Sequence, residues 1–374
     1  MKVLVLIDGF RLGGAETLLI PFAAAAREAG VEVDLVSLVP MEDAAPGLLK
    51  QYRAAGLTPR AVGMRRLLRP DAVPRLVRFI RAGGYDVVHA HLATAITLGV
   101  PAARLARRPV VTTFHTLAPV FEGRARLKER LAVLTATRSD AALFASRASL
   151  DTYADLHYAG HPPANWRVVH NGIDVSGYEP GPADPAVRAE LGGGRDGFLA
   201  VLPAAFREQK GIPHAIAAWS RVVAEQPGAV LALVGGGDEE PVLRAAVREH
   251  GLDEEVVFAG VRTDMAAVYR AADVVVLPSL VENLPTVLIE AGATCRPVVA
   301  TTVGGIGEIV DDGVTGLLCP PADPEAMAEQ LLRLAGDPRL REAMGAAATE
   351  RIRSSFSARV WVEQLVEIYR EAAR

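Results

Sequence analysis

Short apolar runs alternate with longer segments of helical spacing along the first half of the chain. Because buried parallel strands are apolar on both faces, these runs predict strands at residues 2–7, 31–38, 86–90, 110–114, 141–145 and 168–170. Helices are expected over residues 17–29, closed by Gly30, and from Ala93, Ala125 and Arg147. Strands that alternate with helices are typical of βαβ units, so this half predicts a doubly wound parallel sheet.

The alternation restarts at residue 198 after a break. Further strands are predicted at residues 198–203, 230–234, 256–259, 274–277 and 298–301. The helices that follow are expected to begin near Pro213, Glu239, Met265, Pro285 and Glu308. The break, residues 174–197, is rich in Gly, Pro and Asp and predicts a linker. From residue 323 onward the pattern is helical, and it ends in an amphipathic helix.

These patterns predict an α/β protein with two Rossmann-like domains. The 374 residues exceed one ordinary domain, and 50% of them are hydrophobic, which suffices for two cores. No apolar run reaches transmembrane length, and the segment from Met1 to Ile7 has the pattern of a first strand and not of a signal peptide. Cys295 and Cys319 are the only cysteines, which excludes a disulfide framework and fits a cytoplasmic location.

The two halves of the chain differ in charge. Residues 1–172 contain 22 Lys and Arg against 14 Asp and Glu, whereas the remainder contains 18 against 30. The arginine-rich stretch 64–81 has apolar residues at helical spacing. It predicts either a helix docked on its own sheet, which we favour, or a basic helix lying on an anionic membrane. Peripheral membrane contact is therefore an alternative for the first domain, and no nucleic-acid partner is expected.

The main candidate site follows the strand at residues 274–277. Glu282 is expected in the loop beyond the carboxyl end of this strand, and Pro285 fits the first turn of the next helix, which contains Glu290. Ligands of open α/β sheets bind at that edge of the sheet. Each carboxylate can accept two hydroxyl donors, so the pair could hold vicinal sugar hydroxyls. Taken alone, the spacing favours ordinary surface carboxylates, and only its context reverses that interpretation.

Two glycine pairs stand in positions suited to phosphate. Gly13 and Gly14 lie between the first strand and its helix, and Gly304 and Gly305 follow the strand at residues 298–301. Backbone N–H groups in such loops can approach a phosphate closely. The first loop lacks the G-x-G-x-x-G pattern of dinucleotide-binding folds, so an ordinary tight turn is an equal alternative there.

Cations and histidines complete the candidate chemistry. Arg207 and Lys210 follow the first strand of the second half, where they could neutralise a diphosphate leaving group or only form a solvated turn. His115 follows the strand at residues 110–114 and could contact a sugar hydroxyl, whereas structural roles are expected for His89 and His91. No Asp-x-Asp sequence occurs, so no metal site is expected.

Taken together and in this order, the motifs resemble those of glycosyltransferase family 4, retaining enzymes of the GT-B fold that use nucleotide-activated sugars. The motifs that carry the resemblance are Gly13-Gly14, HAH at 89–91, His115, NGID at 171–174, Lys210-Gly211, Glu282 and Glu290, Gly304-Gly305 with Glu308, Gly313 and Gly316, and the closing helix. The resemblance implies two Rossmann-like domains that face each other across a cleft. Residues 1–173 would bind the acceptor and residues 174–354 the nucleotide sugar, while residues 355–374 would cross back to the first domain.

The resemblance also implies roles for single residues. Glu290 would bind the ribose diol, Glu282 the transferred sugar, and His115 would touch the donor sugar. The expected donor site further includes Asn283, Leu284, Pro285 and Thr286, and the diphosphate would be held by Arg207, Lys210 and the backbone of Gly13, Gly14, Gly304 and Gly305. Ala205 stands where the family commonly has Arg, so the role of Arg207 depends on its reach.

The resemblance implies a metal-independent hexosyl- or N-acetylhexosaminyltransferase without a cofactor. The expected donor is a UDP-sugar ahead of a GDP-sugar, and the acceptor is a hydroxyl of a lipid-linked, polysaccharide or natural-product molecule. In such enzymes the acceptor attacks on the face that the leaving group departs from, and the diphosphate takes the proton. The protein then orients the reactants and stabilises charge. Two alternatives stay open: a sugar-nucleotide 2-epimerase of the same fold, and a non-catalytic nucleotide-sugar-binding protein.

Overall fold

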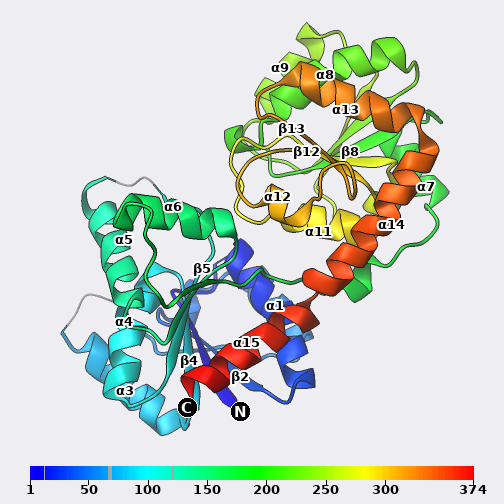
Figure 1. Ribbon diagram of the computed structural model, residues 1–374. Helices are drawn as coiled ribbons and strands as arrows, with labels where there is room; N and C mark the ends of the chain where they lie inside the picture. Colours follow the sequence, from blue (N-terminus) through cyan, green and yellow to red (C-terminus); the bar gives the residue numbers. More distant parts are fainter. Residues whose placement is uncertain (12, 66–69, 120–121) are drawn as a thin grey trace. The chain divides into compact units, whose positions relative to one another are not determined.

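The computed structural model of the chain describes residues 1–11, 13–65, 70–119 and 122–374 (Figure 1). The described residues form two compact units. The first unit comprises Met1–Ile173 together with Ser357–Arg374, and the second unit comprises Asp174–Phe356. Each unit is a parallel sheet with helices packed on both faces, and each therefore has cores of its own.

The first unit contains a seven-stranded sheet in the order β3-β2-β1-β4-β5-β6-β7. Its strands are β1 (Lys2–Ile7), β2 (Glu32–Ser37), β3 (Arg60–Ala61), β4 (Val87–His91), β5 (Val110–Phe114), β6 (Ala141–Phe144) and β7 (Trp166–Val168). All neighbouring strands pair in parallel, and the strand order reverses between β1 and β4. At such a reversal the connections leave on opposite faces, which opens a crevice at the carboxyl ends of the two strands.

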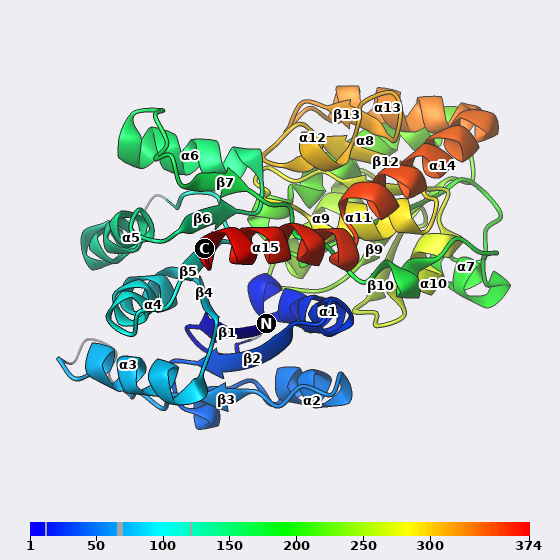
Figure 2. The ribbon, with the colours of Figure 1, turned by 60° about the horizontal axis from the view of Figure 1, so that its bottom comes forward.

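Helices cover both faces of this sheet, as Figure 2 shows. One face carries α1 (Gly14–Glu28), α2 (Pro46–Ala54) and α15 (Ala358–Ala372), and the other carries α3 (Ala72–Gly83), α4 (Ala93–Leu105), α5 (Gly123–Ala136) and α6 (Arg147–Tyr158). The last helix, α15, buries Trp361, Leu365 and Tyr369 in the same core as α1. The ring of Trp361 lies 5.4 Å from that of Phe22. Helices α1 and α15, which are far apart in the sequence, thus share one hydrophobic core.

The structure clarifies the arginine-rich stretch 64–81. Residues 66–69 lie outside the described residues, and the rest of the stretch leads into α3. The apolar side chains Leu76, Val77 and Ile80 of α3 are buried in the core beneath the sheet. The apolar face of this helix is therefore docked on the sheet, in agreement with the favoured of the two interpretations.

The second unit contains a six-stranded parallel sheet in the order β10-β9-β8-β11-β12-β13. Its strands are β8 (Leu199–Pro203), β9 (Val230–Val234), β10 (Val256–Gly260), β11 (Val274–Leu277), β12 (Val298–Thr301) and β13 (Leu317–Cys319). Its helices are α7 (Pro185–Leu191), α8 (Ile212–Glu225), α9 (Glu240–Glu249), α10 (Met265–Ala271), α11 (Thr286–Ala293), α12 (Ile306–Ile309), α13 (Pro324–Gly336) and α14 (Pro338–Ser355). The strand order reverses between β8 and β11, so the second unit has its own switch point.

The prediction of a linker at residues 174–197 was wrong. This stretch forms a short 3-10 turn, Val175–Tyr178, and α7, and it packs within the second unit. Leu191 is buried, and Nη2 of Arg188 lies 2.9 Å from Oδ2 of Asp273. The Pro and Gly residues that suggested a linker mark the two ends of α7, where Pro185 starts the helix and Gly192 ends it. The short strands β3 and β13 were also missed, because two or three residues are too few to show a pattern.

Candidate functional site

Two of the predicted residues meet at the switch point of the second unit. Lys210 follows β8 and Glu282 follows β11, and Nζ of Lys210 lies 2.5 Å from Oε1 of Glu282. The same carboxylate oxygen accepts a hydrogen bond of 2.8 Å from Oγ of Ser279. The side chains of Lys210 and Glu282 are only 20% and 10% exposed, so the ion pair is mostly shielded from water. A shielded ammonium beside a carboxylate can bind a phosphate and a sugar hydroxyl side by side.

Close backbone contacts fix the loops that carry this pair. Gly211 has φ +60°, and a Cβ there would overlap the carbonyl oxygen of Pro278. Gly304 has φ +54°, and a Cβ there would overlap the carbonyl oxygen of Glu282. The N–H of Gly305 donates to the carbonyl of Asn283 at 2.8 Å. The loops after β8, β11 and β12 therefore pack against one another in a way that only glycine allows.

Glu290 lies on α11 and has a different set of partners. Its Oε2 accepts a hydrogen bond of 2.7 Å from the hydroxyl of Tyr269, and Thr286 donates a second hydrogen bond. Burial raises the pKa of Glu290, and the two hydrogen bonds only partly oppose that shift. The ring of Tyr178 lies 6.1 Å from that of Tyr269, and burial beside Glu290 raises the pKa of Tyr178 to about 12. Glu290 is thus held in an aromatic setting that suits a neutral sugar ring.

The remaining residues of the expected donor site lie around these two positions. Asn283, Leu284 and Pro285 connect Glu282 to α11, with Pro285 buried just before the helix begins at Thr286. Arg207 is exposed at the start of the loop after β8.

The sequence interpretation missed a glycine loop and two tyrosines. Gly235 and Gly237 follow β9 with φ near +150°, and a Cβ on Gly235 would overlap the carbonyl oxygen of Ala204. The N–H of Phe206 donates to the carbonyl of Gly236 at 2.9 Å, so this loop supports the one that carries Arg207. Three consecutive glycines after a predicted strand were the available signal. No sequence signal pointed to the tyrosines beside Glu290.

In the first unit, three histidines lie together at the ends of β4 and β5. Nδ1 of His91 and Nε2 of His115 are 2.8 Å apart, and the ring of His89 lies 4.0 Å from that of His91. His89 also contacts the hydroxyl of Tyr369 at 2.6 Å and Oγ1 of Thr113 at 2.7 Å. Burial lowers the pKa of His89 to about 3 and that of His115 to about 4, so both rings are neutral near pH 7. His89 and His91 are buried, as structural roles would require, whereas His115 lines a pocket.

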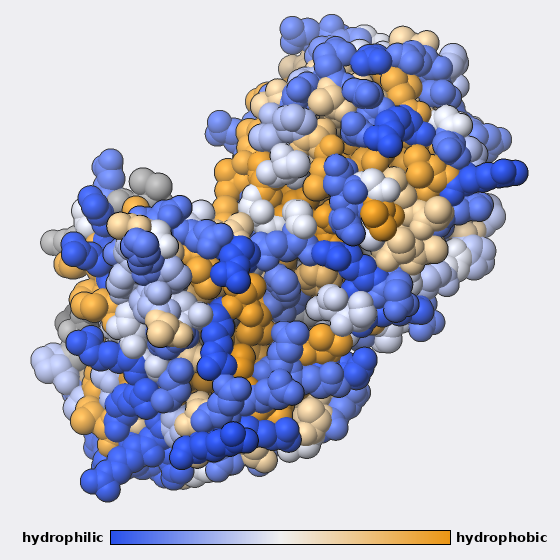
Figure 3. Space-filling model, viewed as in Figure 1, coloured by the Kyte–Doolittle hydropathy of each residue, from blue (hydrophilic) through white to orange (hydrophobic). Residues whose placement is uncertain are grey.

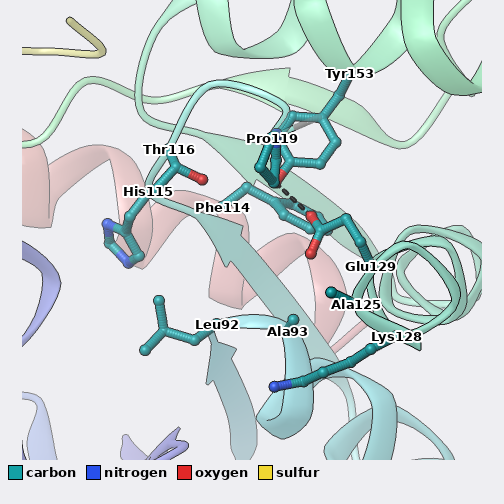
Figure 4. Close-up of a pocket in the computed structure, with 10 residues that line it drawn as sticks. All are labelled: Leu92, Ala93, Phe114, His115, Thr116, Pro119, Ala125, Lys128, Glu129 and Tyr153. Carbon is teal, nitrogen blue, oxygen red and sulfur yellow. Dashed lines mark hydrogen bonds between the residues drawn. The ribbon is translucent and has the colours of Figure 1, made fainter. Parts of the chain in front are cut away.

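The pocket next to His115 has a volume of about 290 Å³ (Figure 4). Its lining residues are Leu92, Ala93, Phe114, His115, Thr116, Pro119, Ala125, Lys128, Glu129 and Tyr153. Figure 4 shows Glu129 turned toward Tyr153, whose hydroxyl donates to Oε1 of Glu129 at 2.6 Å. Lys128 extends along the other side of the pocket, and its Nζ lies 3.8 Å from Oδ2 of Asp8. The pocket is mainly apolar, and its polar groups come from His115, Thr116, Lys128 and Glu129.

The first glycine loop lies at the start of α1. Gly14 is the first residue of the helix, and Gly13 precedes it in an extended conformation. A Cβ on Gly13 would lie 2.6 Å from Oε2 of Glu16, whose side chain is buried in the first turn. Burial raises the pKa of Glu16. These two glycines belong to the first unit, as His115 does, while Lys210, Glu282, Glu290 and Gly304 belong to the second.

Comparison with known proteins decides the family. The model of "Glycosyltransferase Family 4" matches residues 12–176, and that of "Glycosyl transferases group 1" matches residues 197–337. The chain belongs to glycosyltransferase family 4. It is therefore a glycosyltransferase with two Rossmann-like domains of the GT-B type, as the motifs implied.

Individual relatives agree with this assignment. The chain is 34% identical to a D-inositol 3-phosphate glycosyltransferase of Kribbella flavida, over 86% of this chain and 76% of the relative. It is 30% identical to the protein of the same name from Thermobifida fusca, over 96% of this chain and 89% of the relative. The crystal structure of Anabaena HepE in complex with UDP covers 99% of this chain and 100% of its own, with a TM-score of 0.86 and 24% identity. The last comparison supports the fold.

Within the described parts of the chain, no group of three or more His, Cys, Asp and Glu side chains is arranged to hold a metal ion. No helix among the described residues combines the length and the apolar composition needed to cross a bilayer.

Proposed function

We propose that the protein transfers a hexose or N-acetylhexosamine from a UDP-sugar to an acceptor hydroxyl with retention of anomeric configuration. The observation that carries the proposal is the shielded Lys210–Glu282 pair at the switch point of the second unit. Lys210 supplies positive charge for a diphosphate, and Glu282 accepts hydrogen bonds from the hydroxyls of the transferred sugar. Glu290, set between Tyr269 and Thr286, accepts hydrogen bonds from the ribose diol.

In the proposed reaction the bond between the anomeric carbon and the diphosphate oxygen breaks, and the acceptor oxygen bonds to the same face of the sugar. The hydroxyl proton passes to the departing diphosphate. Lys210 and the N–H groups around Gly304 and Gly305 stabilise the charge that develops on the diphosphate. Arg207 supplies a second cation when its side chain extends to the diphosphate. No metal or cofactor is part of the proposal.

UDP is preferred as the nucleotide because solved structures of similar fold contain it. Anabaena HepE of similar fold has been crystallised with UDP and with UDP-glucose. Transfer is preferred to the alternatives of 2-epimerisation and simple binding, because the curated relatives are glycosyltransferases.

For the acceptor we propose a molecule with an apolar part, such as a lipid-linked sugar. Leu92, Phe114, Pro119 and Tyr153 give the pocket beside His115 an apolar lining, which suits an aliphatic or aromatic group better than a polyol. A second candidate acceptor is D-inositol 3-phosphate, because the curated relatives named above carry that substrate in their names. Lys128 is the pocket residue that could meet its phosphate.

A direct assay tests the proposal. The protein is incubated with UDP-glucose, UDP-N-acetylglucosamine or GDP-mannose, with either an octyl glycoside or D-inositol 3-phosphate as acceptor. Product mass, free UDP and the anomeric configuration by NMR are measured. We expect transfer from a UDP-sugar with retention, and faster transfer to the octyl glycoside. Transfer only to D-inositol 3-phosphate would replace the apolar acceptor, and an inverted product would refute the mechanism.

A further inference from the structure

Helix α5 of the first unit carries apolar side chains on two opposite faces. On its inner face Ala132, Val133 and Ala136 are buried in the core beneath the sheet. On its outer face the leucines at positions 127, 131 and 134 are 59%, 44% and 50% exposed. Spacings of four and three residues place the three leucines in one stripe along the helix, opposite the buried face. Three exposed leucines in one stripe are unusual on a surface that faces only water.

Basic residues flank the leucine stripe. At 100° per residue, Arg126 and Arg130 lie on one side of the stripe and Lys128 on the other, and all three are exposed. Arg138 is exposed just beyond the end of the helix. The single acidic residue within α5, Glu129, is turned inward to Tyr153. The outer face of α5 is therefore apolar along its centre and positive at its edges.

Neighbouring elements extend this surface. Leu105 at the end of α4 is 59% exposed, and it is followed by Arg107 and Arg108. On the side of the first unit where Figure 1 labels α4 and α5, Figure 3 shows orange residues exposed among blue ones. By contrast, the apolar side of α3 is buried against the sheet, so that arginine-rich helix offers only its charged side to solvent.

We propose that the outer face of α5 docks onto a membrane surface that contains anionic phospholipids. Leu127, Leu131 and Leu134 would enter the boundary between headgroups and acyl chains. The long side chains of Arg126 and Arg130 would extend to the headgroup phosphates. The pattern suits lipid better than a second copy of this chain, because two copies facing each other through α5 would bring positive side chains together. Anionic lipid supplies both the apolar layer and the negative charge.

The position of α5 links this surface to the pocket beside His115. Ala125, Lys128 and Glu129 of α5 line that pocket, so the helix that would touch the membrane also forms a wall of the pocket. A lipid-linked acceptor would then have its membrane-embedded part on the same side as the pocket. This consequence rests on the proposed function, whereas the docking itself does not.

The docking is tested with the full chain and vesicles, without any assay of activity. Co-sedimentation is measured with vesicles of phosphatidylcholine alone and with vesicles that also contain phosphatidylglycerol. We expect the wild type to bind the anionic vesicles, and the triple variant Leu127→Gln, Leu131→Gln, Leu134→Gln to bind at least about tenfold more weakly. Because these side chains are exposed, the triple variant should keep the thermal unfolding midpoint of the wild type.

Two matched variants control the experiment. Replacing three exposed valines of the second unit, Val242→Gln, Val261→Gln and Val314→Gln, removes a similar apolar area and should leave binding unchanged. Replacing the exposed arginines of α3, Arg75→Glu and Arg78→Glu, should weaken binding less than Arg126→Glu with Arg130→Glu.

Four results would overturn the docking proposal. The first is that the wild type does not bind anionic vesicles, and the second is that the leucine variant binds them as strongly as the wild type. The third is that the valine variant loses as much binding as the leucine variant. The fourth is that the α3 arginine pair, when replaced, weakens binding more than the α5 arginine pair. Light scattering measures the oligomeric state of the wild type and of the leucine variant as a further test. A dimer of the wild type that the leucine variant abolishes would assign the surface to self-association instead.

Discussion

Glu290, which we propose binds the ribose diol, has a buried carboxylate that lowers the stability of its own unit. Its carboxylate is largely shielded from water, and burial disfavours its charge more than the hydrogen bonds from Tyr269 and Thr286 favour it. Glu282 is also shielded, yet it has the ammonium of Lys210 as a direct partner. Burial of the charged carboxylate therefore costs more folding free energy at Glu290 than at Glu282. Substitutions at the two positions can measure this difference.

For Glu290, we expect Glu290→Gln to stabilise the protein at neutral pH. The folded-state pKa is raised above the ordinary value of 4.5, so the wild type loses stability as pH rises from 4.5 through that raised value. Glutamine does not ionise and still accepts a hydrogen bond from Tyr269. The gain should thus be full above the raised pKa and vanish near pH 4.5, as measured by thermal unfolding across that range.

The same variant should weaken UDP binding in calorimetry, because an amide is a poorer acceptor for a diol than a carboxylate. Glu249→Gln, at an exposed position of α9, is the matched control and should change neither property. A Glu290→Gln protein that is no more stable than the wild type at neutral pH would contradict the burial argument.

For Lys210, a single and a double variant separate stability from catalysis. Lys210→Met leaves the carboxylate of Glu282 shielded and unpaired, which should cost about 3 kcal/mol of unfolding free energy. Adding Glu282→Gln removes the unpaired charge and should restore most of that loss. Turnover should fall at least about 100-fold in both variants, because both lack the cation that we propose stabilises the leaving group. Chemical denaturation and initial rates measure the two effects.

If the double variant regained wild-type turnover, Lys210 would serve only to neutralise Glu282. Arg207→Ala is a useful companion, since the exposed Arg207 affects rates only if its side chain reaches the donor.

Among the elements, the strands were easier to predict than the contacts between loops. Burial on both faces makes each long strand a continuous apolar run, and Lys210 and Glu282 were found because each follows such a run. The contact of Glu290 with Tyr269 joins two separate helices, and no local pattern encodes it. Helix α5 was placed, but its outward leucines were not recognised, since apolar residues on two faces leave no single stripe.

The loops at the switch point give a prediction about backbone conformation. Gly304 and Gly313 both have positive φ, but only at Gly304 would a Cβ overlap another backbone atom, while Gly313 has open space. Gly313→Ala should therefore cost about 1 kcal/mol, from the conformation alone. Gly304→Ala should cost clearly more and should displace the loop that holds Glu282.

Thermal unfolding with and without UDP distinguishes the two glycine variants. We expect UDP to raise the unfolding temperature of Gly313→Ala as it does that of the wild type, and to have little effect on Gly304→Ala. Equal costs for both substitutions would mean that the loops adjust freely.

At the scale of the whole molecule, the two units depend differently on the end of the chain. The second unit is continuous from Asp174 to Phe356, whereas the first needs the segment Ser357–Arg374 to cover one face of its sheet. The chain re-enters the first unit beside its point of exit, where the N–H of Ala358 donates to the carbonyl of Ile173 at 2.7 Å.

Removal of residues 357–374 should therefore unfold the first unit and spare the second. The exposed core of the first unit should become sensitive to limited proteolysis, while the protected fragment should contain residues 174–356 and still be stabilised by UDP. Removal of residues 373–374 alone, which follow α15, is the control and should have little effect. Proteolytic resistance of the first unit after the longer deletion would show that α15 is dispensable.

The place of α15 also sets the order in which the units can be finished on the ribosome. Synthesis runs from the amino terminus, and domains ordinarily fold in that order. Here the second unit is the first for which every residue has been made, since the first must wait for the final helix. A chain released early would expose the apolar surface that Trp361 and Leu365 cover, which marks it for chaperones and proteases. The core of the first unit can thus close only after the whole second unit has been synthesised.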